Sequence, residues 1–238
     1  MNVVRLPLLA LLTSLLGLAG CVHTPPAPLY QLETGNSELP SQAAGMAVLL
    51  GPVSVADYLQ RETLLQRQPD GSLTASTEGR WAGSLAGDID QLLLRQLAWR
   101  LDSQRLVLAP ANPGFTPDAQ VLLSINRLDS GPQRPAVLEA QWRVLDKAGQ
   151  LRDSRLVRLE QPHDGSAGDQ VRAQSQLLQQ LAEQLAGAVK PLEGQASAPA
   201  AGETRKPSPA PARNSREPAQ PKIPMAAPVR TEVEVFRF

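Results

Sequence analysis

The chain has 238 residues, with 23 basic and 23 acidic side chains, so its formal net charge at neutral pH is zero. This balance argues against a nucleic-acid-binding protein, because such proteins usually carry an excess of basic residues. Hydrophobic residues make up 42% of the chain but aromatic residues only 3%, which predicts a core of leucine, valine and alanine. The single cysteine, Cys21, excludes an internal disulfide.

The first 20 residues have the pattern of an export signal. Arg5 provides a positive start, and the nearly unbroken apolar run 6–18 follows it. That run is shorter than the roughly 20 residues that a membrane-spanning helix needs. It ends in Leu18-Ala19-Gly20-Cys21, the pattern of a bacterial lipoprotein signal. We therefore predict that residues 1–20 are a cleaved signal peptide and that Cys21 carries the lipid. The alternatives are an ordinary signal peptide with a chance cysteine or a short membrane helix.

Several acyl chains on Cys21 would hold the protein firmly to a membrane, because one chain gives only marginal binding. Val22 stands where an aspartate would favour retention in the inner membrane under the enterobacterial sorting rule. Val22 therefore favours the outer membrane, with the protein facing the periplasm. Residues 21–28 are rich in proline, which predicts an extended, lipidated tether.

The next segments predict short strands. Residues 29–32 have strand character, and the apolar run 46–50 fits a buried strand that Gly51-Pro52 stops. Residues 62–67 and 72–76 flank Pro69-Asp70-Gly71, whose residue types suit a tight turn. They predict a hairpin.

Residues 81–101 predict the first helix. Apolar side chains recur there at three- and four-residue spacing, while Asp88, Gln91, Arg95 and Gln96 fall largely on other faces. Asp88 and Asp90 are two residues apart, so they do not face each other, and we expect both on a solvated face.

Strand patterns return after this helix. Residues 105–109, 121–125, 138–144 and 151–160 predict strands, and the last three are joined by short turns, which favours an antiparallel meander. Residues 167–189 predict a second amphipathic helix that Pro191 ends.

The order of strands, helix, strands and helix predicts one α+β domain over residues 29–190. We expect an antiparallel or mixed sheet with the two amphipathic helices on one face. Residues 191–238 are dominated by proline, alanine, glycine, serine and charged residues, which predicts a disordered, low-complexity tail. Within it, residues 232–238 alternate polar and apolar side chains and could add a strand, although a dangling tail is the simpler interpretation.

The sequence gives little support for an enzyme, a metal site or a cofactor. The two histidines are His23, in the proline-rich tether, and His163, in a turn beside Asp164. No nucleophile elbow, phosphate-binding glycine loop or zinc-protease motif occurs in the sequence. We expect a non-catalytic protein without cofactors.

Short motifs in a particular order carry a resemblance to a known family. The lipoprotein signal is followed by Tyr30-x-Leu32, then Gly51-Pro52-Val53, then Tyr58-Leu59-Gln60-Arg61, and finally Arg80-Trp81-Ala82. From the signal to about Val189, the chain resembles the auxiliary lipoproteins of PqiC type, which belong to intermembrane transport systems built around MCE proteins. In that family an acidic residue usually follows Arg-Trp-Ala, and here Gly83 takes its place.

The resemblance implies a non-catalytic outer-membrane anchor and adaptor that docks a periplasmic MCE-domain protein for lipid transport between the two membranes. A homo-oligomeric ring around that partner is compatible with it. The candidate partner-binding residues are Tyr58, Arg61, Arg80 and Trp81, because aromatic and arginine side chains in loops suit interfaces. For Trp81 a place in the core, and for Arg80 a plain surface charge, are the alternatives.

Two other functions remain open from the sequence. The proline- and alanine-rich tail could span periplasmic distance, which fits a structural lipoprotein that binds peptidoglycan or an envelope synthase. A lipid carrier would need an internal cavity, which the sequence neither predicts nor excludes.

Overall fold

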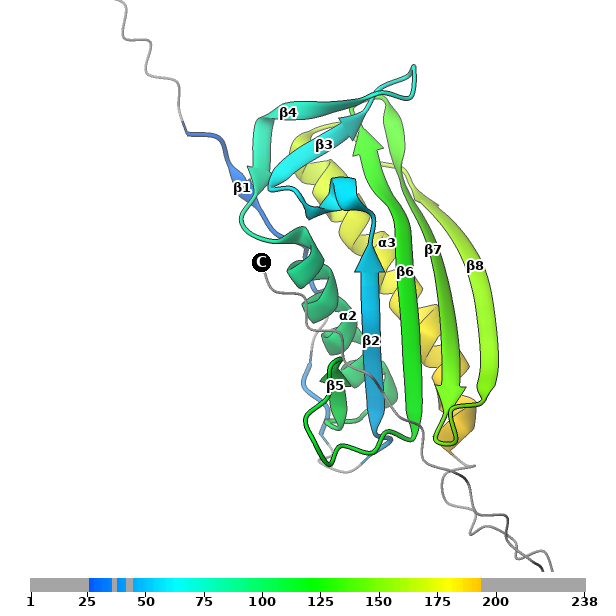
Figure 1. Cartoon of the computed structure of the whole chain (residues 1–238). Helices are drawn as coiled ribbons and strands as arrows, with labels where there is room; N and C mark the ends of the chain where they lie inside the picture. Colours follow the sequence, from blue (N-terminus) through cyan, green and yellow to red (C-terminus); the bar gives the residue numbers. More distant parts are fainter. Residues whose placement is uncertain (1–25, 36–37, 42–44, 194–238) are drawn as a thin grey trace, which may run out of the picture. The chain divides into compact units, whose positions relative to one another are not determined.

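A computed structural model describes residues 26–35, 38–41 and 45–193 of the chain (Figure 1). The predicted signal peptide, Cys21 and the tail from residue 194 onward, including its predicted disorder, lie outside the described residues.

The described elements follow the predicted order of strands, helix, strands and helix. They are β1 (Leu29–Tyr30), β2 (Val48–Val55), the 3-10 helix η1 (Asp57–Gln60), β3 (Thr63–Arg67), β4 (Leu73–Trp81), α2 (Leu85–Leu101), β5 (Leu106–Leu108), β6 (Ala119–Gly131), β7 (Arg134–Asp146), β8 (Leu151–Gln161), α3 (Ala167–Val189) and the 3-10 helix η2 (Lys190–Leu192).

The strands form one mixed, eight-stranded sheet. β6, β7 and β8 make the predicted antiparallel meander, and β3 and β4 make the predicted hairpin. β2 runs parallel to both β5 and β6, and β1 runs parallel to β4. The long strand β6 connects the β3–β4 hairpin to the rest of the sheet, because Ser130, near its end, also pairs with β3. The α+β prediction with a mixed sheet is therefore confirmed.

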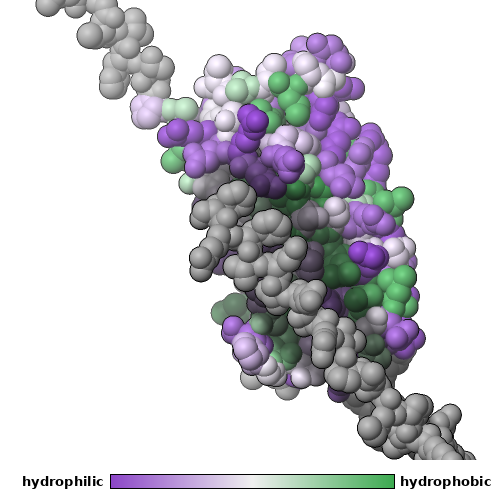
Figure 2. Space-filling view, in the orientation of Figure 1, coloured by the Kyte–Doolittle hydropathy of each residue, from purple (hydrophilic) through white to green (hydrophobic). Residues whose placement is uncertain are grey.

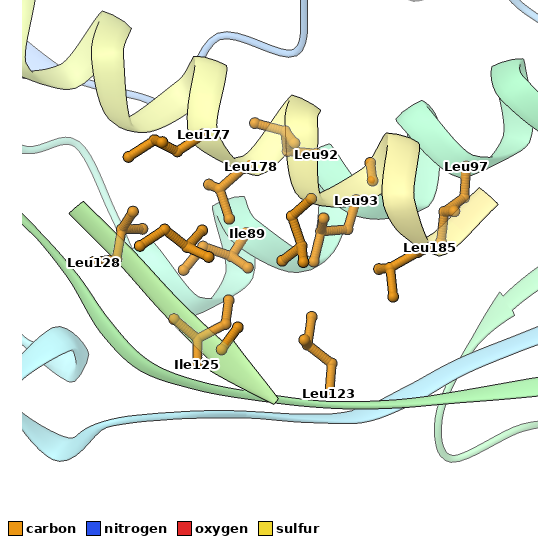
Figure 3. Packing of buried hydrophobic residues seen from close by; sticks show 14 of the residues in the cluster. Ile89, Leu92, Leu93, Leu97, Leu123, Ile125, Leu128, Leu177, Leu178 and Leu185 are labelled. Atoms are coloured by element: carbon orange, nitrogen blue, oxygen red, sulfur yellow. The ribbon is translucent and has the colours of Figure 1, made fainter. Parts of the chain in front are cut away.

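The two helices pack against one face of this sheet and against each other. Figure 3 shows side chains of α2 and α3 pointing toward Leu123, Ile125 and Leu128 of β6. The fully buried residues of the two helices are those that the apolar spacing predicted, among them Ile89, Leu92, Leu93, Leu97, Leu178, Leu181 and Leu185. Burying such side chains is the main favourable contribution to folding.

The first helix begins four residues later than predicted. Trp81 is the last residue of β4, where its N–H donates to the carbonyl of Glu62 at 2.9 Å. Ser84 then caps α2, because its hydroxyl accepts a hydrogen bond from the N–H of Gly87. The predicted helix began at Trp81 because this buried residue fits the apolar spacing of the helix, although it lies in a strand.

Strand β2 does not stop at Gly51-Pro52 as predicted. It continues to Val55, and its pairing with β6 shifts register between Leu50 and Val53. Gly51 and Pro52 lie opposite the single residue Leu122, so a bulge of one extra residue interrupts the ladder at a glycine and a proline, which strands accommodate at such points.

Three polar residues of α2, Asp88, Asp90 and Gln96, are less exposed than predicted. Gln96 is buried, and its amide donates to the carbonyl of Thr34. Asp88 is half-buried, and burial raises the pKa of its carboxyl group although the N–H of Leu32 donates to it. The segment that leads from β1 covers this side of α2, which helical periodicity cannot predict.

The second helix ends at Val189 as predicted. The next turn, η2, still belongs to the compact domain, because Leu192 is buried in the core. The packed chain therefore extends two residues beyond the predicted start of the tail at residue 191.

Candidate functional site

Three of the four predicted partner-binding residues come together in the structure. Tyr58 lies in η1, Arg61 follows η1 directly, and Trp81 ends β4. These positions are adjacent because β3 and β4 form an antiparallel hairpin. The end of β4 therefore lies beside the start of β3, which follows η1 in the chain. The N–H of Ala56 donates to the carbonyl of Ile125 at 2.9 Å, which fixes the start of η1 against β6.

Arg80 is close to the other three along the sheet, but it does not line the small cavity that they share. It pairs with Leu29 of β1 and Thr63 of β3 through the backbone, and its side chain is exposed. Trp81, the next residue along the strand, is buried. Alternate residues of a strand face opposite sides, so the two members of the Arg80-Trp81 motif have different surroundings. The prediction that Trp81 could be a core residue is the one that the structure favours.

A small cavity lies where Tyr58, Arg61 and Trp81 meet. Its volume is about 10 Å³, and we call it the Tyr58 cavity. Its lining also includes Leu59, Thr63, Leu64, Leu65, Leu85, Leu128 and Gln174. A cavity of this size holds about one water molecule. It is far too small for a lipid chain or a metabolite, so this region offers a packed surface rather than a binding pocket.

The Tyr58 hydroxyl anchors η1 to the sheet. It accepts a hydrogen bond from the N–H of Leu128 and donates one to Asp129 Oδ2, both at 3.2 Å. Burial, together with the charge of Asp129, raises the pKa of Tyr58 to about 12. Tyr58 is therefore neutral at any physiological pH, and it acts as a hydrogen-bonding bridge.

Asp129 is the centre of a buried ion cluster at the end of β6. Its side chain is 2% exposed and lies 2.6 Å from Arg67 Nη2 and 3.0 Å from Arg127 Nη2. Burial by itself would raise the pKa of Asp129. The hydrogen bonds and positive charges of the two arginines outweigh burial, so the pKa is lowered. The carboxylate thus joins β3, β6 and η1 into one unit.

A second polar cluster lies beside Asp129, between β6 and α3. Ser130 Oγ donates to Gln170 Oε1 at 3.1 Å and accepts from Gln174 Nε2 at 2.9 Å. Gln170 Nε2 donates to the carbonyl of Gly165 at 2.7 Å. All three side chains of this cluster are buried. The sequence analysis did not predict this cluster. Gln170 and Gln174 lie on the same helical face as the buried Leu178 and Leu181, and that position could have indicated that they are buried.

The described residues contain no group of three histidine, cysteine or acidic side chains arranged to hold a metal. His163 lies in the predicted turn, where its Nδ1 accepts a hydrogen bond from the N–H of Gly165 at 3.0 Å. The bond stabilises the turn that leads into α3. Among the described residues, none of the helices combines the length and apolarity needed to cross a bilayer.

An open groove of about 580 Å³ lies beside α2. It lies between Leu94 and Ala98 of α2, Leu106 of β5 and the segment around Leu39. The groove is separate from the residues that the sequence singled out.

The fold occurs in solved structures with little sequence identity. One is the crystal structure of an uncharacterized protein, with 20% identity and a TM-score of 0.52, covering 65% of this chain and 99% of that one. Another is protein XCC0632 from Xanthomonas campestris, a DUF330 protein, with 16% identity and a TM-score of 0.53, covering 72% of this chain and 95% of that one. Both share this α+β domain.

A weaker likeness is to a PelC dodecamer from Paraburkholderia phytofirmans, with 15% identity, a TM-score of 0.37 and coverage of 65% and 91%. It is too distant to carry an argument about assembly. A comparison with curated proteins finds no match.

The mixed sheet with two helices on one face thus also occurs in other solved structures. The model of the ABC-type transport auxiliary lipoprotein component matches residues 30–186, and the chain belongs to this family. It is therefore a lipoprotein-family component of a transport system, associated with the cell envelope.

Proposed function

We propose that the chain is a non-catalytic outer-membrane lipoprotein that serves as the periplasmic adaptor of an MCE-type lipid transport system. The observation that carries this proposal is the family match over residues 30–186, which covers the described domain almost entirely. The lipoprotein signal ending in Cys21 supports membrane anchoring, and Val22 supports the outer membrane.

The surface proposed to meet the partner surrounds η1 and the end of β4. Arg61 and Arg80 are exposed, and within the described residues neither guanidinium has an ion pair or hydrogen bond. Two free arginines beside a rigid backbone suit contact with acidic or carbonyl groups. Tyr58 and Trp81 support the same surface. The hydrogen bond to Asp129 holds Tyr58 in place, and Trp81 is buried in the core. A homo-oligomer around the partner is part of this proposal.

The membrane anchor is tested with Cys21→Ala. The variant is expected to remain unprocessed or to appear in the soluble periplasmic fraction, while the wild type sediments with the outer membrane. Wild-type levels of the variant in outer-membrane fractions would show that another feature holds the protein there.

Partner binding is tested by pull-down from detergent-solubilised membranes. The wild type is expected to recover an MCE-domain protein, and Arg61→Glu with Arg80→Glu is expected to recover much less of it. Arg95→Glu is the matched control, because Arg95 is also exposed and lies away from η1, on α2. Failure of the intact wild type to recover any MCE-domain protein would count against the proposal.

The alternative function, a structural lipoprotein that binds peptidoglycan or an envelope synthase, depends on the proline-rich tail. Its test is deletion of residues 194–238, which leaves buried Leu192 in the core. Loss of all function with an intact domain would favour this alternative over the adaptor.

A further inference from the structure

Residues 29–35, which we call the strap, join the predicted lipid tether to the domain. The strap begins with the two-residue strand β1, at one end of the sheet beside β4, and continues as irregular chain (Figure 1). It contains Tyr30-x-Leu32, a motif that the proposed partner surface does not use.

Side chains of α2 bind the main chain of the strap. The N–H of Leu32 donates a hydrogen bond to the carboxyl group of Asp88. Two residues further along the strap, the carbonyl of Thr34 accepts a hydrogen bond from Gln96 Nε2. Both bonds would form with any side chains at Leu32 and Thr34, because only backbone groups of the strap take part.

Helix α3 and strand β4 bind the strap in the same way. The N–H of Glu33 donates to Ser175 Oγ at 3.0 Å, and the carbonyl of Glu33 accepts from Gln179 Nε2 at 3.1 Å. The N–H of Ala82 donates to the carbonyl of Tyr30 at 2.8 Å. The strap therefore lies across both helices and the end of β4, and each of them holds it through its backbone.

Only two side chains of the strap pack against the core, and they are Tyr30 and Leu32 of the motif. Leu32 is buried and Tyr30 is partly buried. The Tyr30 ring lies against Gly79 of β4 so closely that a methyl group on Gly79 would overlap the ring. Gln31 and Glu33 are exposed, and Figure 2 shows a mostly hydrophilic surface where β1 meets β4. Backbone bonds at a sheet edge with two alternate anchoring side chains are the way an extended peptide is recognised.

We propose that the strap behaves as a docked peptide, which leaves its place on β4, α2 and α3 while the rest of the domain stays folded. Segments held by few apolar contacts open locally at a much lower free energy than the core. The strap has two such contacts, whereas α2, α3 and β6 share a continuous apolar core.

Release of the strap changes the reach of the domain from the membrane, and this consequence rests on the lipid anchor of the proposed function. With the strap docked, residues 21–28 link Cys21 to the domain and span no more than roughly 28 Å. With the strap released, residues 21–35 span up to roughly 52 Å. The tether therefore has two lengths, and the longer one lets the domain meet a partner farther from the bilayer.

Amide hydrogen exchange of the full mature chain, followed by NMR, tests the release. The amides of Leu32, Glu33 and Ala82 report docking, because each donates a bond that docking makes. We expect them to exchange about 100-fold faster than the core amides of β6. Their rates should stay constant in low urea, because local opening exposes little surface. Exchange at the rate of β6, with the same dependence on urea, would overturn the proposal, since the strap would then open only with the whole domain.

Gly79→Ala releases the strap without removing a core side chain. The added methyl group overlaps the Tyr30 ring, so exchange at the three reporter amides should rise about tenfold while exchange in β6 is unchanged. Gly83→Ala is the matched control, because nothing lies within 4 Å of a methyl group at that position. Leu32→Ala removes the second anchor and should act like Gly79→Ala, with the exposed Leu29→Ala as its control. Equal acceleration in β6 would overturn the proposal, because the strap would then be part of the cooperative core.

The change in reach is measured on vesicles of phosphatidylethanolamine and phosphatidylglycerol. A fluorophore attached through Leu156→Cys, at an 80% exposed position of β8, transfers energy to acceptor-labelled lipids in the bilayer. Transfer is expected to be weaker for Gly79→Ala than for Gly83→Ala, and equal transfer would overturn the two tether lengths. A chain that does not attach to the vesicles would contradict the lipid anchor of the proposed function, and the exchange rates would still decide whether the strap is released.

Discussion

Two buried regions along β6 are stabilised in different ways. In one, leucines and isoleucines of α2, α3 and β6 fill the space between helices and sheet (Figure 3). In the other, at the far end of β6, Asp129 and Ser130 form hydrogen bonds with arginine, tyrosine and glutamine side chains. The apolar region depends on volume, whereas the polar region depends on the pairing of each buried donor and acceptor.

The difference has a consequence for function. The polar region supports η1 and the neighbouring strand end, where the exposed Arg61 and Arg80 lie. Directional hydrogen bonds hold that surface in place, because a buried polar network whose groups are satisfied is rigid. The apolar region stabilises the domain as a whole but does not fix the position of the surface that carries Arg61 and Arg80.

The apolar region is tested by Leu178→Ala, which we expect to have the largest effect. Leu178 is fully buried, so its truncation leaves a cavity and should lower the free energy of unfolding by about 3–5 kcal/mol. Urea unfolding followed by circular dichroism measures the change. Leu39→Ala, at an 88% exposed leucine, is the control, and it should change stability by no more than about 0.5 kcal/mol.

Asp129→Asn tests the polar region. Loss of the carboxylate leaves Arg67 and Arg127 without their buried partner and should cost about 2–3 kcal/mol at pH 7. The pKa of Asp129 is lowered in the folded protein, so its contribution is complete above the unfolded value of about 4. It is lost as the pH falls through the folded pKa. The stability difference between wild type and variant should therefore shrink below about pH 4, and a constant difference down to pH 2 would contradict this account.

The glutamine pair of α3 gives a sharper comparison within the polar region. Gln170→Leu removes the acceptor of Ser130 and the donor to Gly165, and should cost about 2 kcal/mol. Gln174→Leu should cost about 1 kcal/mol or less, because within the described residues its Oε1 has no hydrogen-bond partner. Thermal unfolding of the two variants side by side measures the difference, and equal losses would argue against this assignment of the bonds.

Tyr58→Phe should have a small effect, about 1 kcal/mol, because one buried hydroxyl with two hydrogen bonds is removed. The chain has two tyrosines, so the ultraviolet titration of the folded protein should show one ionising near pH 12. This step should be absent from the variant. Since the folded pKa is raised above the unfolded value of about 10, the wild type should lose stability as the pH rises from about 10 toward 12.

The sequence by itself determined the repeating elements of the fold. Residues 167–189 form the predicted helix, and the meander of β6, β7 and β8 follows the predicted alternation. The two-layer α+β arrangement follows because amphipathic helices must bury their apolar faces on the sheet. Local periodicity is sufficient for these features, since each depends on side chains a few residues apart.

Only the tertiary structure decided which polar side chains are buried and which candidate residues meet. Asp129 lies 62 residues from Arg67 and 71 from Tyr58 along the chain, so no local pattern relates them. The same is true of Gln96, which lies under a segment that precedes it by 62 residues. Trp81 belongs to β4 rather than to α2 because pairing with β1 and β3 outweighs helical spacing. Strand pairing and hydrogen bonds between residues far apart in the chain decide between local conformations, helix or strand, that the local sequence allows equally.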